Sequence, residues 1–353
     1  MLWRAIALLV LAAVGASQAA AKSPRQDIIP LTITAKPMPL DPTQPKQERV
    51  GALLYRGGLE LHADSPLFGG LSGLALSPDG DTLVAVSDTG YWFIADLVLD
   101  QEGTLIGLEN AVMADLLRPD GLAHQGRALS DAEALAIDYR RGVVYVAFEN
   151  RHRIWAYDFN PYRDMRQLLR TPARAIDDKG ALAKQPGNGG VEALCWVEGE
   201  GLVALSEEHG DGAGGRAGWL FKSGRPMVLR YDAPLPYVPT DAAALPGGKA
   251  LILNRQASWL SGFAAKLVLA QMPTFEPGAQ ISGEVIAEFG GSVISDNFEG
   301  IAAWQDRDGD IAVYMVSDDN YNPLQRNLLL KFLLKPETDQ FQKLVGPPAK
   351  LFR

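Results

Sequence analysis

The stretch Asp131–Asn150, DAEALAIDYRRGVVYVAFEN, decides the fold of this chain. An apolar run after Glu133 is followed by a turn with Gly142, a second apolar run and then Glu149. Two short apolar runs on either side of a glycine turn predict a β-hairpin. Because the runs are apolar throughout and do not alternate, we expect both faces of the hairpin to be covered. The two glutamates at its ends need a separate explanation.

The same arrangement occurs five times along the chain. Each copy has a small or acidic start, an apolar strand, a glycine turn, a second apolar strand and a charged end. The copies cover residues 71–90, 131–150, 190–210, 240–256 and 297–320. Aligned positions in them, separated by 61, 59, 49 and 58 residues, are Ser72, Glu133, Glu192, Asp241 and Glu299. A period of this size fits one four-stranded propeller blade with loop insertions.

We therefore predict an all-β fold, a β-propeller of five or six four-stranded blades. Residues 50–65 and 327–346 lie at opposite ends of the chain, and we expect their strands to pair and close the ring. A degenerate N-terminal blade would raise the number to six. Residues 111–117 are the best candidate for a helix. The alternative, a set of generic β-hairpins, explains the strands but not the repeated acids.

Composition excludes some functions. The chain has 353 residues, is 47% hydrophobic and carries a net charge of -9. This charge argues against general nucleic-acid binding, which needs a basic face. Cys195 is the only cysteine, so no intramolecular disulfide can form. Because it stands in an apolar stretch, we expect a small buried hydrophobic residue there rather than a catalytic thiol.

The beginning of the chain predicts export. Residues 1–21 combine Arg4, an apolar run over Ala5–Val14 and small residues before Lys22, which is typical of a secretory signal peptide. The alternative, a membrane anchor, usually needs about 20 apolar residues. We expect a periplasmic or secreted monomer with no membrane span after cleavage. Residues 22–48 predict a leader or linker, and residues 49–353 predict the propeller domain.

The repeated acids predict a cation site. In a propeller, the starts of first strands and the ends of second strands lie near one mouth of the central channel. The strand-end residues are Asp88, Glu149, Glu207 with Glu208, Arg255, and Asp318 with Asp319. Carboxylates gathered without counter-charge raise one another's pKa, and Ca²⁺ relieves this repulsion through six to eight oxygen ligands. The alternative for any single acid is a turn cap or a hydrogen bond to backbone amides.

A family resemblance supports the prediction of a propeller with an acidic site. The starts E-A-L and E-G-I, and the segment SDDNYNPLQRNLLLKFLL from Ser317, resemble the bacterial phytase-like β-propeller family, the esterase-like activity of phytase family. The resemblance covers about residues 50–335 and is most specific at 297–301 and 317–332. It implies a propeller fold, export and hydrolysis of phosphoesters or esters.

What the resemblance implies for individual residues applies only at positions that match the family's motifs. Those positions are the blade starts Glu133, Glu192 and Glu299, and the SDDN element with its following turn, Asp318, Asp319, Asn320, Gln325 and Arg326. Two positions depart from the pattern. Asn254 stands where an acid is expected before Arg255, and Ser72–Gly73 replaces the acid of the first blade.

We expect an exported, metal-dependent hydrolase that acts on a small anionic phosphoester at the channel mouth. A carboxylate would serve as the base toward water, arginines would hold the anion, and Ca²⁺ would neutralise the phosphoryl charge. The predicted catalytic residues are Glu133, Glu299, Arg255 and Arg326. The predicted metal ligands are Glu133, Glu192, Asp241, Glu299, Asp88, Glu149, Glu207, Asp318 and Asp319.

Alternatives stay open at this point. Each arginine could instead form a salt bridge with a carboxylate of a neighbouring blade. The protein could be a calcium-dependent lactonase or carboxylesterase on the same scaffold. It could also be a non-catalytic binding propeller, which predicts exposed aromatic residues at the mouth, with Tyr91, Trp92 and Tyr321 as candidates.

Overall fold

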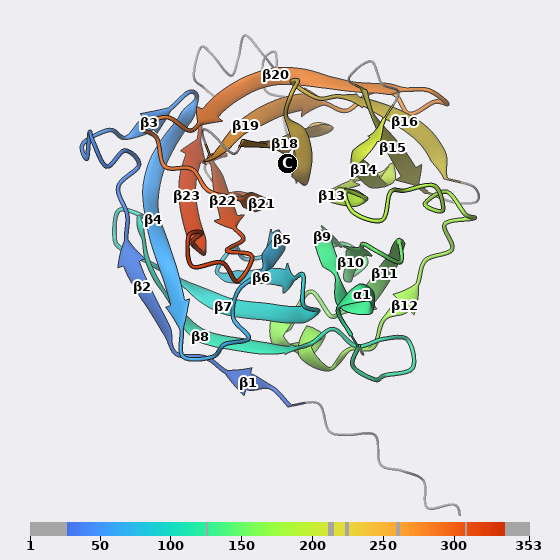
Figure 1. Cartoon of the computed structure of the whole chain (residues 1–353), viewed down its shortest axis with the longest axis horizontal. Coiled ribbons are helices and arrows are strands. Elements are labelled where there is room, and N and C mark those ends of the chain that lie inside the picture. Colours follow the sequence, from blue (N-terminus) through green and yellow to red (C-terminus); the bar gives the residue numbers. More distant parts are fainter. Residues whose placement is uncertain are drawn as a thin grey trace, which may run out of the picture.

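The computed structural model describes residues 27–124, 126–210, 215–222, 226–258, 262–307 and 309–335. These residues are almost entirely β-structure and form sheets arranged around a central axis (Figure 1). The predicted signal peptide, residues 1–21, lies outside the described residues, as does the start of the predicted linker. The prediction of an all-β propeller is confirmed.

The described strands group into five four-stranded blades. Blade 1 contains β5 (Leu71–Leu76), β6 (Thr82–Ser87), β7 (Tyr91–Leu99) and β8 (Leu105–Asp115). Blade 2 contains β9 (Ala132–Asp138), β10 (Val143–Phe148), β11 (Arg153–Asp158) and β12 (Arg174–Ala175). Blade 3 contains β13 (Val191–Val197), β14 (Gly201–Gly210), β15 (Gly215–Phe221) and β16 (Met227–Asp232). Blade 4 contains β17 (Val238–Leu245), β18 (Lys249–Ser258), β19 (Gly262–Gln271) and β20 (Gln280–Phe289).

Blade 5 joins the two ends of the described chain. It contains β21 (Phe298–Gln305), β22 (Ile311–Ser317), β23 (Leu328–Leu334) and, from the N-terminal side, β4 (Leu53–Ala63). Strand β4 runs antiparallel to β23, with Leu53 opposite Leu334 and Glu60 opposite Leu328. The expected pairing of the two chain ends is therefore confirmed for the described part of both segments. Backbone hydrogen bonds along this pair hold the ring closed.

The innermost strand of each blade faces the axis. Strands β5, β9, β13, β17 and β21 each pack against the next, and β21 packs against β5 to complete the cycle. Figure 1 shows β5, β9, β13 and β21 around the centre and β2, β4, β8 and β20 toward the outside. Strands β5 and β10 are buried at every position, as expected where both faces are covered by neighbouring blades.

The hydrophobic core is divided among the contacts between blades. Five clusters of buried residues occur in the described chain, and each joins residues of two neighbouring blades. Blades 3 and 4 also share an edge, because β16 and β20 pair in parallel. Burial of apolar surface between the blades is therefore the main force that holds the ring together.

The segment predicted as a linker contains short strands. Strand β1 (Ile29–Pro30) pairs with β8 of blade 1, and β2 (Ile33–Pro37) pairs with β4 of blade 5. A third strand, β3 (Arg49–Val50), begins directly after the predicted linker and also pairs with β4. Residues 29–37 thus connect the outer edges of two blades.

The predicted helix at residues 111–117 is wrong. Residues 111–115 belong to β8, where Met113 lies opposite Phe93 of β7. The pairing of a whole strand outweighs the weak helical preference of this segment. The described helices are short: α1 (Arg127–Ser130) and the 3-10 helix η1 (Met165–Arg170).

The inner strands approach closely at Gly73. This residue has φ +41, and a Cβ atom there would lie 2.6 Å from the backbone nitrogen of Leu135 in the next blade. We expect Gly73→Ala to lower the free energy of unfolding by about 1–3 kcal/mol more than Gly103→Ala. Gly103 is the matched control because it also has a positive φ, +75, but no atom within 4 Å of the added Cβ.

Denaturant unfolding of both variants measures this difference. Equal loss of stability in the two variants would contradict close packing of the inner strands at Gly73.

Candidate functional site

Three of the predicted acids project from bulges in the inner strands. In β9, β13 and β21 the pairing register shifts by one residue, which leaves Glu133, Glu192 and Glu299 without a directly paired residue on the second strand. A bulge of this kind redirects a side chain. All three glutamates line one cavity at the same end of the channel.

The other two inner strands carry the same bulge with different residues. The unpaired residue is Gly73 in β5 and Thr240 in β17. In blades 1 and 4, Gly73 and Thr240 therefore occupy the position that a glutamate holds in the other three blades. The alignment of the sequence repeat, which placed Ser72 and Asp241 at this position, is wrong by one residue in each case. At Gly73 the close approach of Leu135 leaves no room for a carboxylate, which explains the missing acid of blade 1.

The ends of the second strands meet these bulges. Backbone N–H groups of Asp88, Glu149, Glu207 and Asp318 donate to carbonyls just before the inner strands of their own blades, at distances of 2.8 to 2.9 Å. This repeated bond places the strand-end side chains beside the bulged glutamates. The result is a cavity of about 480 Å³. Its lining is Asp88, Asp131, Glu133, Glu149, Asn150, Asn188, Gly189, Glu192, Glu207, Arg255, Asn297, Glu299, Asp318 and Asn320.

Three of these carboxylates fit a single cation. Asp131, Glu133 and Glu149 each offer an oxygen, and the three atoms lie within 4.8 Å of one another. Oxygens on opposite sides of a bound Ca²⁺ ion stand about 5 Å apart, because each Ca–O distance is about 2.3–2.6 Å. The Glu133 carboxylate also accepts a hydrogen bond from the Ser72 hydroxyl at 3.3 Å. The donor set is all oxygen, which suits a hard divalent cation.

Arg255 is the one cation among the residues that line the cavity. Its Nη2 lies 2.8 Å from Glu207 Oε1, its Nη1 lies 2.9 Å from Glu299 Oε1, and Nη1 also donates to Asn297 Oδ1. The Nε atom is buried and has no hydrogen-bond partner in the described part of the chain. Three neighbours thus fix the guanidinium while one donor stays unused.

Burial and repulsion favour the protonated form of several carboxyl groups. Burial, and then the charges of Asp131, Glu149 and others, raise the pKa of Glu133 well above its usual range. Burial, with Glu133 and Glu149 nearby, does the same to the pKa of Glu192. Burial raises the pKa of Glu299 to about 8, although Arg255 opposes the shift. Burial raises the pKa of Asp318 to about 7. A bound cation would reverse these shifts.

Asp241, a predicted metal ligand, is not part of the cavity lining and has a different set of partners. Its Oδ2 accepts the backbone N–H of Ile301 at 2.8 Å and that of Leu74 at 3.3 Å, and its Oδ1 accepts that of Ala242 at 2.8 Å. The side chain is fully buried. It therefore ties blade 4 to blades 1 and 5 across the axis.

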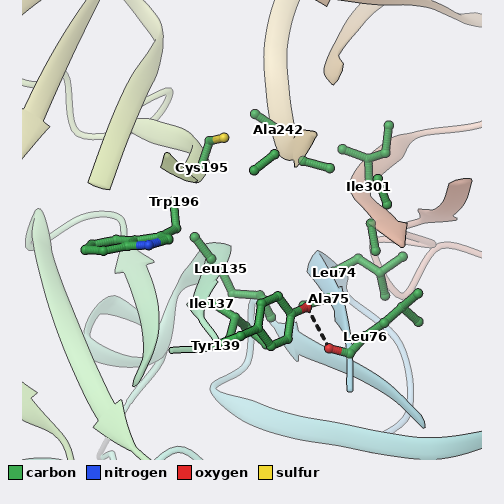
Figure 2. A pocket seen from close by; sticks show the side chains of 15 residues that line it. Leu74, Ala75, Leu76, Leu135, Ile137, Tyr139, Cys195, Trp196, Ala242 and Ile301 are labelled. Carbon is green, nitrogen blue, oxygen red and sulfur yellow. Dashed lines mark hydrogen bonds between the residues drawn. The ribbon is translucent and has the colours of Figure 1, made fainter. Parts of the chain in front are cut away.

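The channel beyond Asp241 is apolar. Figure 2 shows Leu74, Leu135 and Ile301 converging there from three inner strands, with the Cys195 sulfur beside Ala242. The free space is small, about 60 Å³. Burial raises the pKa of the Cys195 thiol to about 12, which agrees with the predicted role as a buried hydrophobic residue. The acidic cavity is thus closed on its inner side by apolar packing.

The remaining predicted residues lie beside the cavity. Arg326 forms a salt bridge with Asp296, Nε to Oδ2 at 2.9 Å, and is not part of the lining. Asp319 accepts the N–H of Gly70 at 3.2 Å and the side-chain amide of Asn327 at 2.9 Å. Glu208 is exposed next to Glu207 and is also outside the lining.

The aromatic candidates do not form an exposed group. Trp92 is fully buried in the core between blades 1 and 2, so its prediction as an exposed residue is wrong. Residues 92–95 of β7 are all buried, because Trp92 and Ile94 pack toward blade 2 and Phe93 and Ala95 pack toward blade 5. Tyr91 is half-buried, and Tyr321 is 40% exposed with its hydroxyl 3.0 Å from Thr89.

Sequence reasoning missed several residues of the cavity, above all Asp131. A signal was available, because Asp131, Gly190 and Asn297 stand two positions before the bulged glutamates. Asp131 and Asn297 line the cavity from this position. Asn150 directly follows Glu149 at the end of the second copy of the repeat, whereas Asn188 lies in a loop outside the repeat.

In the part of the chain that the structure describes, no helix is long and apolar enough to cross a membrane.

Comparison with known proteins identifies a family. The phytase-like family, described as esterase-like activity of phytase, matches residues 66–321. No curated protein matches the sequence.

The solved structures that resemble the chain include three distant ones. U3-55K is 11% identical with a TM-score of 0.40, over 85% of this chain and 98% of its own. A protein of unknown function from Dyadobacter fermentans is 12% identical with a TM-score of 0.40, over 87% and 93%. Hydrazine synthase from Kuenenia stuttgartiensis is 12% identical with a TM-score of 0.35, and the match covers 74% of this chain but 62% of that one. Likenesses this weak have no bearing on function.

Asp241 is expected to act as a structural acceptor. Asp241→Ala leaves the N–H groups of Leu74, Ile301 and Ala242 without their acceptor, and we expect a loss of about 3 kcal/mol in the free energy of unfolding. Asp241→Asn keeps one carbonyl oxygen and should lose less. Denaturant unfolding measures both variants. Unchanged stability of Asp241→Ala would contradict this role.

The cavity predicts a pH-dependent effect of calcium. The folded protein holds protons on Glu299 and Asp318 up to about pH 8 and about pH 7, whereas the unfolded chain releases them at ordinary carboxyl pKa values. Stability of the cation-free protein therefore falls as pH rises through this window. A cation that binds the ionised carboxylates restores the lost stability, so Ca²⁺ should raise the Tm more at about pH 8 than at about pH 5.

Thermal unfolding with Ca²⁺ or with chelator, at both pH values, measures this effect. An equal increase in Tm at the two pH values would contradict binding to these carboxylates.

Proposed function

The chain belongs to the phytase-like family, and from this premise we propose that it is a cation-dependent hydrolase of phosphoesters that works at the acidic cavity. One observation carries the proposal. The carboxylate triad of Asp131, Glu133 and Glu149 lines the same cavity as Arg255, so a cation site and an anion-binding side chain face one space. Cations and arginines aimed at one anion are the usual means of stabilising phosphoryl transfer.

The cation site is proposed for Ca²⁺. When bound by Asp131, Glu133 and Glu149, the ion would supply positive charge for the oxygens of the ester. The chemistry of the triad supports a hard cation, because each ligand is a carboxylate and the spacing suits Ca–O distances. Glu192, Glu299 and Asp318 line the same cavity and extend the negative charge around the site.

Arg255 is proposed to orient the substrate. Its guanidinium is held by Glu207, Glu299 and Asn297, which fixes the direction of its donors. The positive charge of the held guanidinium would attract an oxygen of the anion. Because the guanidinium is already positioned, little side-chain entropy is lost when the substrate binds.

Glu299 is proposed to transfer a proton. Burial raises the pKa of Glu299 to about 8 in the cation-free protein, and a cation held by the triad would bring it down toward neutral pH, where a carboxyl group exchanges protons efficiently. Its contact with Arg255 holds the carboxylate in place at 2.9 Å. It would accept a proton from the attacking water or donate one to the leaving oxygen.

Export to the periplasm or the medium is part of the proposal. The pattern of residues 1–21 supports it, and calcium is available outside the cytoplasm. The description of the family also names an esterase-like activity, which keeps a carboxylic ester as the second candidate substrate.

Turnover by the mature chain, from Lys22, tests the proposal. We would measure release of a chromogenic leaving group from a phosphomonoester, a phosphodiester and a carboxylic ester, each with Ca²⁺ and with chelator. We expect calcium-dependent turnover of a phosphoester. Glu299→Gln should lower kcat by about 10² or more, because it removes the proton-transfer group. Glu133→Gln should raise the calcium concentration needed for activity.

Glu198→Gln is the matched control. Glu198 is a carboxylate just past the opposite end of β13, is 59% exposed, and in the described part of the chain forms an ion pair with Arg140 at 2.7 Å. It should keep full activity. Turnover of the carboxylic ester alone would favour the second candidate, and no turnover of any ester by folded protein would contradict a hydrolase.

A further inference from the structure

A second cavity lies beside the acidic cavity. Its volume is about 370 Å³, within the range of small-molecule sites. Its lining, which we call the arginine–tryptophan pocket, is Arg118, His124, Leu129, Arg151, Arg153 and Trp155. The linings of the two cavities come from adjacent residues of the chain. Leu129 of α1 precedes Asp131 by two residues, and Arg151 directly follows Asn150, while Asp131 and Asn150 both line the acidic cavity.

The pocket is positively charged in an acidic protein. Arg118 pairs with Asp120. The described hydrogen bonds of Arg153 go to the backbone carbonyls of Arg151 and Leu129 and not to a carboxylate. Burial, with the nearby charge of Arg151, lowers the pKa of Arg153 to about 10, although Tyr157 and Asp131 oppose the shift. Arg153 is still charged at neutral pH. An anion in the pocket would therefore meet the guanidinium groups of Arg151 and Arg153, whose charge is poorly neutralised by carboxylates.

The walls of the pocket are planar. The rings of His124 and Trp155 stack with their centres 5.1 Å apart. The Arg153 guanidinium lies 4.5 Å from the centre of the Trp155 ring and 4.1 Å from that of Phe148. Burial, with the charges of Arg153 and Arg118, lowers the pKa of His124 to about 4, so the imidazole is uncharged at neutral pH. Flat apolar surfaces with a cation beside them suit an aromatic ring.

We propose that the arginine–tryptophan pocket binds the part of the substrate remote from the reacting ester, a planar apolar group that carries an anionic substituent. This inference rests on the proposed function, because it assigns the ester itself to the acidic cavity. The acidic carboxylates repel the anionic substituent, whereas Arg151 and Arg153 attract it. The two neighbouring cavities would therefore fix the direction in which the substrate lies.

Binding without turnover tests the pocket alone. The probe is naphthalene-2-sulfonate, compared with uncharged 2-naphthol, measured by calorimetry on the full mature chain in the presence of chelator. We expect the sulfonate to bind at least tenfold more tightly than the naphthol. Arg151→Gln should weaken sulfonate binding about tenfold, since a hydrogen bond to a charged group is lost. Trp155→Leu should weaken the binding of both probes.

Arg140→Gln is the matched control, because Arg140 is 80% exposed at the far end of blade 2. It should bind the sulfonate as the unchanged protein does. Arg151 is itself exposed, so its variant should keep the Tm of the parent and stay informative if Trp155→Leu fails to fold. Equal binding of the two probes, or unchanged sulfonate binding by Arg151→Gln, would overturn the proposal.

Kinetics separate this inference from the proposed function. For a naphthyl phosphate with a sulfonate substituent, Arg151→Gln should raise KM about tenfold at unchanged kcat. Sulfonate binding without turnover of any ester would support the pocket and reject the hydrolase. Turnover with no binding of the sulfonate would reject the pocket and keep the hydrolase.

Discussion

Repulsion between buried carboxylates is the constraint on which the rest of the site depends. Ring closure brings Glu133, Glu192 and Glu299 to one cavity from three different blades, and second-strand ends add further acids. Removing a carboxylate from water and placing it beside another is unfavourable unless it is protonated or bound to a cation. The fold therefore holds these groups in a state that a hard cation stabilises. Apolar packing between blades supplies the free energy that keeps them together.

Much of the fold follows from the sequence. The fivefold repeat of apolar hairpins predicts a propeller because inner strands covered by neighbouring blades must be apolar on both faces. Pairing of residues 50–65 with residues 327–346 was also predictable, because these strands have no other repeat to join. The blade number needed coordinates, since only the pairing of β4 with β23 shows that the N-terminal strand completes blade 5 and does not start another.

The site was less predictable, for reasons that particular residues make clear. The sequence repeat predicted Glu133, Glu192 and Glu299 as site residues, because a repeated acid within a buried strand is conspicuous. It misaligned Ser72 and Asp241 by one residue, because a bulge changes the register without leaving a mark in composition. Because its register differs by one residue, the Asp241 side chain points to the backbone of two other blades and not into the cavity. The arginine–tryptophan pocket could not be predicted, because α1 and the turn after β10 are brought together only by the fold.

The position of a bound cation tests the central claim most directly. Crystals of the protein grown with Ca²⁺ above neutral pH, and examined by anomalous scattering at long wavelength, would locate the ion. We predict a peak between the carboxylates of Asp131, Glu133 and Glu149, with oxygen ligands at about 2.3–2.6 Å. An ordered cavity with no peak, in which these carboxyl groups share protons with one another, would contradict the claim that the acids are gathered to bind a cation.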